Sequence, residues 1–79
     1  MTTETEKHQT ATEMIESAIQ VLDGASEYMH LVYSSSAYTV VSVCHSLRAI
    51  SGTEFRQYCE RITQIDARWI DNPGPRFLP

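Results

Sequence analysis

Few residues in this sequence could carry nucleophilic or metal chemistry, and their spacing favours neither. The candidates are His8, His30, His45, Cys44 and Cys59. Zinc sites typically draw on pairs such as C-x₂₋₄-C or H-x₃₋₅-H, and neither pair occurs in the chain. We therefore expect no bound metal and no cofactor.

A cysteine or serine nucleophile is disfavoured for a related reason. Cys44 and His45 are adjacent, and adjacent side chains on a helix point about 100° apart, so the imidazole does not face the thiol. Ser42 and Ser46 flank this pair, but no orienting carboxylate or nucleophile-elbow motif accompanies them. The sequence predicts a protein that is not an enzyme.

Composition narrows the remaining classes of protein. The chain has 79 residues, enough for one domain with a small core that self-association or a partner would support. Its formal net charge of −4 argues against a general nucleic-acid binder. No apolar run approaches the roughly 18–20 residues of a membrane span, and the start "MTTETEKHQT" is too polar for a signal peptide. We expect a cytoplasmic protein with reduced cysteines.

The apolar periodicity predicts an all-α protein, with a flexible tail at 1–9, one helical domain at 10–72 and a Pro-rich tail at 73–79. Thr10 and Glu13 form a capping-box pattern, which predicts a first helix from there to about Tyr33. Gly24 marks a bend or break within it. Its apolar stripe comprises Met14, Ala18, Val21, Leu22, Ala25, Met29 and Val32, widened by Ile15, Ile19 and Tyr28.

The β-branched stretch "AYTVVSVC" has strand propensity but favours a helix in context. Val40 and Val41 would face opposite sides of a strand, and the chain offers no second strand to pair with it. We therefore predict a second helix over 36–50, after a polar break at Ser34–Ser36 and with Gly52 as its C-cap. Its stripe comprises Ala37, Val40, Val41, Cys44 and Leu47.

A second capping box, Ser51 with Glu54, predicts the start of a third helix, and Pro73 and Pro75 stop it. Its stripe comprises Phe55, Tyr58, Cys59, Ile62, Ile65, Trp69 and Ile70. Three helices with short connections predict an antiparallel three-helix bundle, or a helical hairpin with the third helix across it. The wide apolar face of the first helix indicates dimerisation through the first or second helix.

Charge is distributed unevenly along the chain. Residues 1–33 carry a net charge of −5 and residues 34–79 a net charge of +1. One face of the first helix would hold Glu13, Glu16, Gln20, Asp23 and Glu27, spaced three and four apart. This acidic stripe is either a docking surface for a basic partner or an ordinary solvated face.

Two further groups of residues have both a binding and a structural interpretation. Arg56, Arg61 and Arg68 could bind an acidic partner or RNA, or pair with Glu60 and the first helix. Tyr33 and Tyr38 flank the serine stretch, where amphipathic aromatics serve as binding anchors or pack in the core. The predicted partner-binding residues are Glu13, Glu16, Asp23, Glu27, Tyr33 and Tyr38.

The stretch "AYTVVSVCHSLRAI", with Tyr38 and Thr39 ahead of Val41, Val43 and Leu47, resembles the second helix of a small phage-encoded helical anti-CRISPR protein of the type I-E class. The overall plan is similar too: a short acidic chain, a Glu- and Ile-rich helix, a Tyr-Thr-Val helix and a third helix of mixed charge. The Pro-rich ending and the arginines of the third helix depart from that pattern.

The resemblance implies a non-enzymatic inhibitor that acts in the bacterial cytoplasm. Such a protein binds a subunit of a CRISPR effector complex and blocks its action. Two alternatives stay open from the residues themselves. One is a small regulatory or antitoxin-like helical dimer that binds a partner protein, and the other is a nucleic-acid binder that uses the arginines of the third helix.

Overall fold

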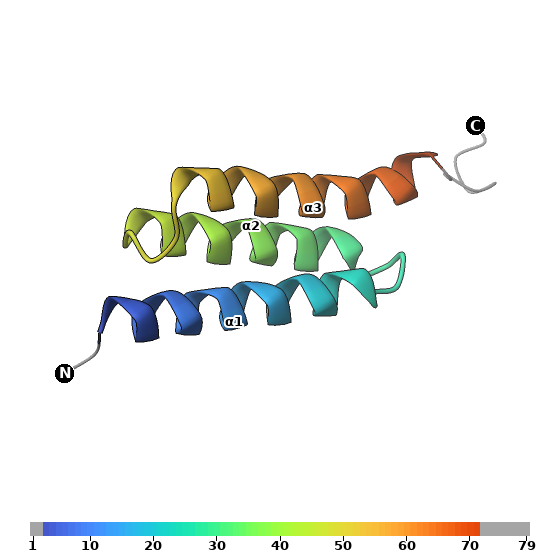
Figure 1. The fold of residues 1–79 in the computed structure, drawn as a ribbon. Coiled ribbons are helices and arrows are strands. Elements are labelled where there is room, and N and C mark those ends of the chain that lie inside the picture. Colours follow the sequence, from blue (N-terminus) through green and yellow to red (C-terminus); the bar gives the residue numbers. More distant parts are fainter. Residues whose placement is uncertain (1–2, 72–79) are drawn as a thin grey trace, which may run out of the picture.

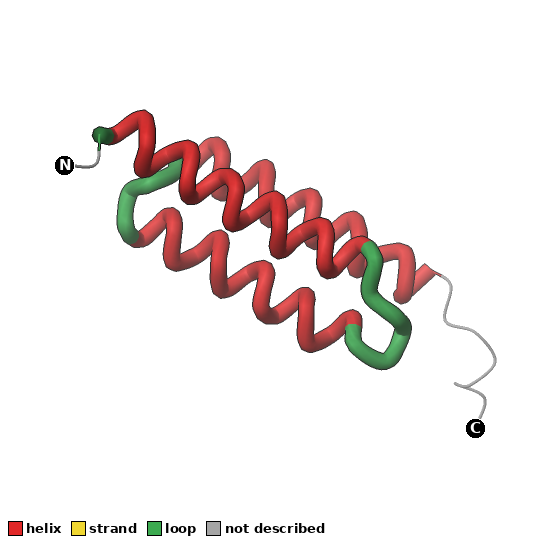
Figure 2. The backbone as a smooth tube through the Cα atoms, turned by 90° about the horizontal axis from the view of Figure 1, so that it is seen from below, coloured by secondary structure: helices red, strands yellow, loops and turns green. Residues whose placement is uncertain are grey.

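The computed structural model of the protein describes residues 3–71, with side chains for residues 3–68. These residues form three helices: α1 (Glu4–Asp23), α2 (His30–Ser46) and α3 (Gly52–Asp71). Consecutive helices run antiparallel and α2 lies between the other two in Figure 1, so α1 and α3 point the same way. Figure 2 shows the same three rods connected by two short turns. The predicted all-α three-helix bundle is confirmed.

Helix α1 begins earlier and ends earlier than predicted. Thr3 is its N-cap, and the Thr3 hydroxyl accepts a hydrogen bond from the Glu6 amide at 3.0 Å. The segment expected to be a flexible tail is therefore helical from Glu4, and the predicted capping box at Thr10 is wrong. At the other end the Gly24 amide donates to the Gln20 carbonyl at 3.1 Å. The predicted continuation to Tyr33 is wrong because the helix stops at the Gly24 break.

Helix α2 confirms the helical prediction for the β-branched stretch, with shifted ends. The turn at 24–29 already reverses the chain, so α2 starts at His30 and the predicted break at Ser34–Ser36 lies inside it. Serine competes with the backbone for hydrogen bonds in a helix. Here the buried Ser34 hydroxyl instead donates to Asp66 Oδ2 on α3 at 2.7 Å, which gives this serine a tertiary partner.

The turn between α2 and α3 is a Schellman motif rather than a glycine cap at Gly52. Arg48 adopts a positive φ of 59°, and its amide donates to the His45 carbonyl at 2.9 Å. The Ala49 amide donates to the Cys44 carbonyl at 2.9 Å. These two bonds close the helix end in the Schellman pattern. Gly52 is the first residue of α3, so its predicted role as C-cap is wrong.

The second capping box is confirmed. The Ser51 amide donates to Glu54 Oε1 at 2.8 Å, and the Glu54 amide donates to the Ser51 hydroxyl at 3.1 Å. Two otherwise unpaired amides at the start of α3 are satisfied in this way. The reciprocal bonds fix where α3 starts and hence the register of its side chains against α1.

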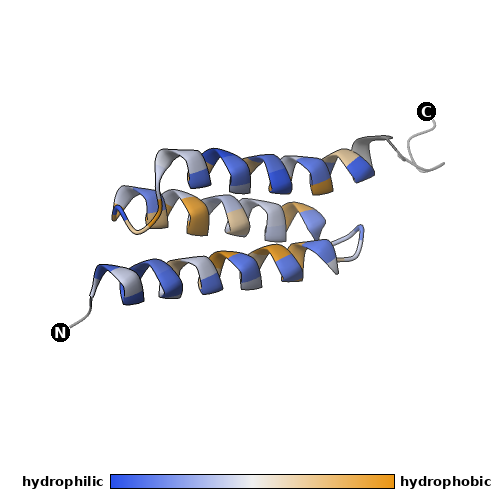
Figure 3. Ribbon diagram, viewed as in Figure 1, coloured by the Kyte–Doolittle hydropathy of each residue, from blue (hydrophilic) through white to orange (hydrophobic). Residues whose placement is uncertain are grey.

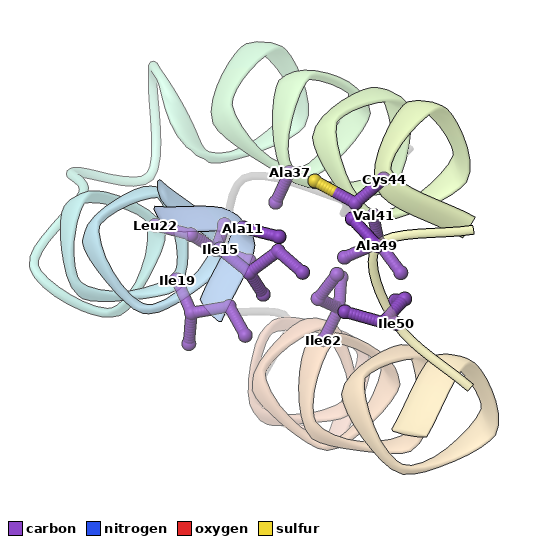
Figure 4. Packing of buried hydrophobic residues seen from close by; sticks show 10 residues of the cluster. All are labelled: Ala11, Ile15, Ile19, Leu22, Ala37, Val41, Cys44, Ala49, Ile50 and Ile62. Atoms are coloured by element: carbon purple, nitrogen blue, oxygen red, sulfur yellow. The ribbon is translucent and has the colours of Figure 1, made fainter. Parts of the chain in front are cut away.

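The core is small and is built mainly from aliphatic side chains that point between the helices (Figure 4). Its members are Ala11, Ile15, Ile19, Leu22, Ala37, Val41, Cys44, Ala49, Ile50 and Ile62. The third predicted stripe is confirmed from Phe55 to Ile65. The side chains of Trp69 and Ile70 and the predicted tail at 73–79 lie outside the described residues. Both cysteines are free thiols, and Cys59 packs against the core that contains Cys44.

Five residues of the predicted stripes are exposed instead of buried: Met14, Val21, Tyr28, Val32 and Leu47. Tyr28 and Val32 lie beyond the end of α1 at Asp23, so they do not continue its apolar stripe. The α1 core centres on Ile15 and Ile19, so Met14 and Val21 lie at the edge of the apolar face. Leu47 follows the last turn of α2, where the Schellman motif redirects the chain. The apolar content of α1 and α2 thus exceeds what the bundle itself buries.

Candidate interaction surface

The acidic residues of α1 meet the arginines of α3 across the bundle. Arg61 donates through Nη1 and Nη2 to the two carboxylate oxygens of Glu16, at 2.6 and 2.8 Å. Arg68 pairs with Asp23 one heptad further along. Because α1 and α3 are parallel, the sequence separation is 45 in both pairs. The predicted pairing with the first helix is confirmed for Arg61 and Arg68, whereas Arg56 makes no such pair among the described residues.

A third contact extends this row to the other end of α3. His8 Nε2 lies 2.6 Å from Glu54 Oε2, and Glu54 also caps the helix. The hydrogen bond from the Ser51 amide, followed by that from His8, lowers the pKa of Glu54 below its ordinary value. The side-chain hydrogen bond from Arg61 likewise lowers the pKa of Glu16. Both carboxylates are stabilised in their charged form.

The predicted acidic stripe is therefore not a uniform negative surface. Glu16 and Asp23 face α3 and are neutralised there, whereas Glu13 is exposed and accepts from the Gln9 side chain at 3.3 Å. Glu27 lies in the turn after α1, so the predicted extension of the stripe to it is wrong. The structure gives Glu16 and Asp23 an internal role, and their contact with a partner stays a prediction.

Tyr33 and Tyr38 do not form a shared exposed anchor. Both are half-buried and pack against the core. The Tyr38 hydroxyl shares a 2.8 Å hydrogen bond with the Thr63 hydroxyl on α3. Their structural interpretation, packing within the bundle, is the one that these contacts support.

The structure brings together a serine, a histidine and an aspartate that are dispersed in the sequence. Asp66 accepts from the Ser34 hydroxyl at 2.7 Å, and its other oxygen lies 3.5 Å from His30 Nε2. In a catalytic triad the histidine lies between serine and aspartate, whereas here the aspartate lies between the other two. Ser34 is also buried, so this cluster ties α2 to α3 and does not present a nucleophile.

The grooves on the described surface are open to solvent. One, of about 320 Å³, lies between α1 and α3 and is lined by residues that include Ile19, Ile65 and the paired Arg61. Within residues 3–71, no group of three or more histidine, cysteine or acidic side chains could hold a metal ion. No described helix combines the length and apolar character that crossing a membrane requires.

The exposed side of α2 is the most distinctive surface of the bundle. From Tyr28 to Leu47 the sequence holds no Asp, Glu, Lys or Arg, and α2 is pale to orange over its middle turns in Figure 3 while α3 is mostly blue. We call the outward-facing residues of α2 and its C-cap the uncharged face: Leu31, Val32, Ser35, Ser36, Thr39, Ser42, Val43, Ser46 and Leu47. Two further residues of the segment are exposed but lie outside this face, since Tyr28 is in the turn before α2 and His45 stacks on Phe55 of α3.

The uncharged face exposes large apolar side chains. Leu31 is 74% exposed, Val32 56%, Val43 50% and Leu47 61%. Single exposed apolar residues are ordinary, but four on one segment whose other outward-facing residues are small hydroxyls form a patch. Contiguous patches of this kind mark contact sites on soluble proteins. The sequence-based prediction missed this face because it assigned Val32 and Leu47 to the core, although the absence of charged residues from Tyr28 to Leu47 is visible in the sequence.

Two residues of α1 extend the patch. Met14 and Val21 are about half exposed and lie on one side of α1, one heptad apart. Met14 lies two positions before Glu16, and Val21 lies two positions before Asp23. Two positions along a helix correspond to a rotation of about 200°, so both side chains point away from the side of α1 that faces α3. That side of α1 borders α2. The apolar surface therefore continues from the uncharged face onto α1.

The chain matches no protein-family model, no curated protein and no solved structure.

Proposed function

We propose that this protein is a non-enzymatic protein-binding protein whose contact surface is the uncharged face of α2. One observation carries the proposal: a 17-residue helix that exposes Leu31, Val32 and Val43 with no formal charge between Glu27 and Arg48. Water-facing helices normally carry charged residues on their outer side. An uncharged outer side with apolar groups has the character of the core of a protein interface.

The chemistry of the remaining surface supports the same proposal. The Ser34–Asp66–His30 cluster is arranged for packing, and Arg61 and Arg68 are occupied by carboxylates. Arginines neutralised in this way contribute little to the attraction of a phosphate backbone. A protein partner therefore accounts for the surface better than a substrate or a nucleic acid does.

For the class of partner we propose a subunit of a bacterial CRISPR effector complex, whose action the bound protein blocks. The support is the resemblance of residues 37–50 to the helix of a small anti-CRISPR protein. Within that stretch Val41 is buried in the core, whereas Val43 and Leu47 lie on the uncharged face. Part of the shared pattern is thus available for contact with another protein.

A binding assay with the purified type I-E effector complex tests both levels of the proposal. We expect the wild-type protein to bind and Val43→Lys to weaken binding at least about tenfold, because a lysine ammonium would be buried in an apolar contact. Gln57→Lys is the matched control, since Gln57 is exposed on α3 and gains the same charge. Equal binding by all three would remove the uncharged face from the contact, and no binding by any would remove this partner class.

A further inference from the structure

The uncharged face raises the question of which molecule covers it. Three properties bear on the answer: the charge of the whole chain, the size of the core, and the area of the exposed strip. Each favours a second copy of this chain. The inference rests on the proposed function, since it concerns the same face: the second copy covers the face in the free protein, and a foreign partner that binds there displaces it.

The charge distribution makes the uncharged face compatible with its own copy. The chain has a net charge of −4, so two copies that met through the acidic exposed side of α1 would repel each other. All acidic and basic residues other than histidine lie outside residues 28–47. Two copies that meet through α2 bring no like charges into direct contact and leave the charged helices in water. An apolar contact between like-charged chains is also strengthened by salt, because salt screens the residual repulsion.

The core is small, so the burial of further apolar surface in a dimer would add to the stability of the fold. Among the side chains that the structure describes, Ile15, Leu22, Ile62 and Val41 are the large ones that are fully buried, and three of the ten core residues found there are alanine. Both cysteines are free, so no disulfide supports the described bundle. Chains of this size commonly rely on oligomerisation for additional burial. The exposed apolar groups of α2 and α1 are the ones available for it.

The area of the face agrees with a dimer of ordinary size. A standard interface buries about 800 Å² per partner, roughly one seventh of the 5713 Å² that the chain exposes. Helices α2 and α1 side by side offer a strip roughly 25 Å long and about 20 Å wide. The accessible area of a strip covered by side chains exceeds its projected area. The α2 face with Met14 and Val21 is therefore large enough, whereas α2 alone is not.

We propose that the protein forms a symmetric homodimer in which the uncharged faces of two α2 helices pack antiparallel. The symmetry axis passes near Thr39, midway along the exposed residues. In this arrangement Val32 of one chain lies opposite Leu47 of the other, as a two-fold contact requires. Leu31, which is about 160° around α2 from Leu47, lies at the rim. Met14 and Val21 of each α1 complete the contact along one edge, and the ion-paired side of α1 and the α3 helices stay on the outside.

Sedimentation of the full chain over a range of concentrations tests the inference. We expect twice the chain mass of 9.0 kDa at micromolar concentration and no weakening of the dimer as salt is raised. Val43→Lys and, independently, Val32→Lys should each raise the dimer dissociation constant at least about tenfold, while Gln57→Lys should not. Far-UV circular dichroism of each variant verifies that it is folded. Both substituted valines are exposed, so the fold should tolerate them.

Three results would overturn the inference. They are a monomeric wild-type chain at all concentrations, a dimer that neither lysine variant weakens, and a dimer that dissociates in high salt. The result for the proposed function is separate. If the wild-type chain is a monomer but Val43→Lys still abolishes binding to another protein, the face binds a foreign partner and only the homodimer is wrong. If neither self-association nor partner binding depends on Val43, both proposals fail.

Discussion

The carboxylate of Glu16 and the guanidinium of Arg61 form a bidentate ion pair, with N–O distances of 2.6 and 2.8 Å. The pair joins the two helices that contact each other least, α1 and α3. Asp23 and Arg68 repeat it one heptad along. These two ion pairs thus link α1 and α3 in their parallel register, while α2 supplies most of the apolar contact to both helices.

A charge swap tests whether this pair sets the register. Glu16→Arg places two cations side by side and should lower the free energy of unfolding, and adding Arg61→Glu should recover most of the loss. Each side chain is 44% exposed, so solvent screens the pair and the coupling should be about 0.2–1 kcal/mol. Urea unfolding of the four members of the cycle measures it. A coupling of zero would mean that the pair does not contribute to the stability of the folded chain.

Acid should weaken the fold through the same row of contacts. The pKa values of Glu16 and Glu54 lie below the ordinary value of 4.5 in the folded protein, so below about that pH the unfolded chain binds more protons. Stability should therefore be complete above the ordinary pKa and decline as the pH falls through the lowered values. Urea midpoints measured down the pH scale check this. The double variant Glu16→Gln, Glu54→Gln should lose less stability on acidification than the wild type; an equal loss would contradict the assignment.

The positive φ of Arg48 predicts a stabilising substitution. A residue with a Cβ is strained in this region by about 1–2 kcal/mol, and glycine is not, although glycine loses more backbone entropy on folding. Arg48→Gly should therefore raise the free energy of unfolding by up to about 1 kcal/mol. Thermal and urea unfolding measure the change. Arg48→Ala is the control for loss of the charge, and it should give no such gain.

The Ser34–Asp66 bond predicts a destabilising substitution. Ser34→Ala removes the donor at 2.7 Å and leaves a part-buried carboxylate oxygen without it, which should lower the free energy of unfolding by about 1–3 kcal/mol. Ser36→Ala, at an exposed position of the same helix, is the matched control and should be close to neutral. Equal effects of the two substitutions would show that the hydroxyl of Ser34 has no special role.

The apolar periodicity and the capping motifs predicted the features that depend on residues close together in the sequence. The helical nature of α2, the Ser51–Glu54 capping box and the core-facing stripe from Phe55 to Ile65 follow from spacing and side-chain type, and all three are confirmed. Helix ends were less predictable because several residues could cap. Thr3 and Thr10 both precede a glutamate by three positions, and only the first starts the helix.

Most of the features that the sequence did not predict depend on contacts between residues far apart in the sequence. Ser34 sits inside α2 because Asp66, distant in sequence, accepts its hydroxyl. Arg48 occupies a conformation that usually selects glycine, which no sequence pattern signalled. The sequence predicts a partner surface on the acidic residues of α1, but the arginines of α3 neutralise two of them. The absence of charge from Tyr28 to Leu47 was the signal for the alternative surface.

The most direct test of the uncharged face as a contact surface is oxidative cross-linking through Thr39→Cys. Thr39 is exposed at the middle of the face, so in the antiparallel dimer its two copies meet at the symmetry axis. We expect rapid formation of a disulfide-linked dimer by this variant, and slow formation by Gln57→Cys and by the wild type, whose Cys44 is buried and whose half-buried Cys59 lies on α3, outside the uncharged face. If the Thr39→Cys variant cross-links no faster than the Gln57→Cys variant, the uncharged face is not where two copies meet.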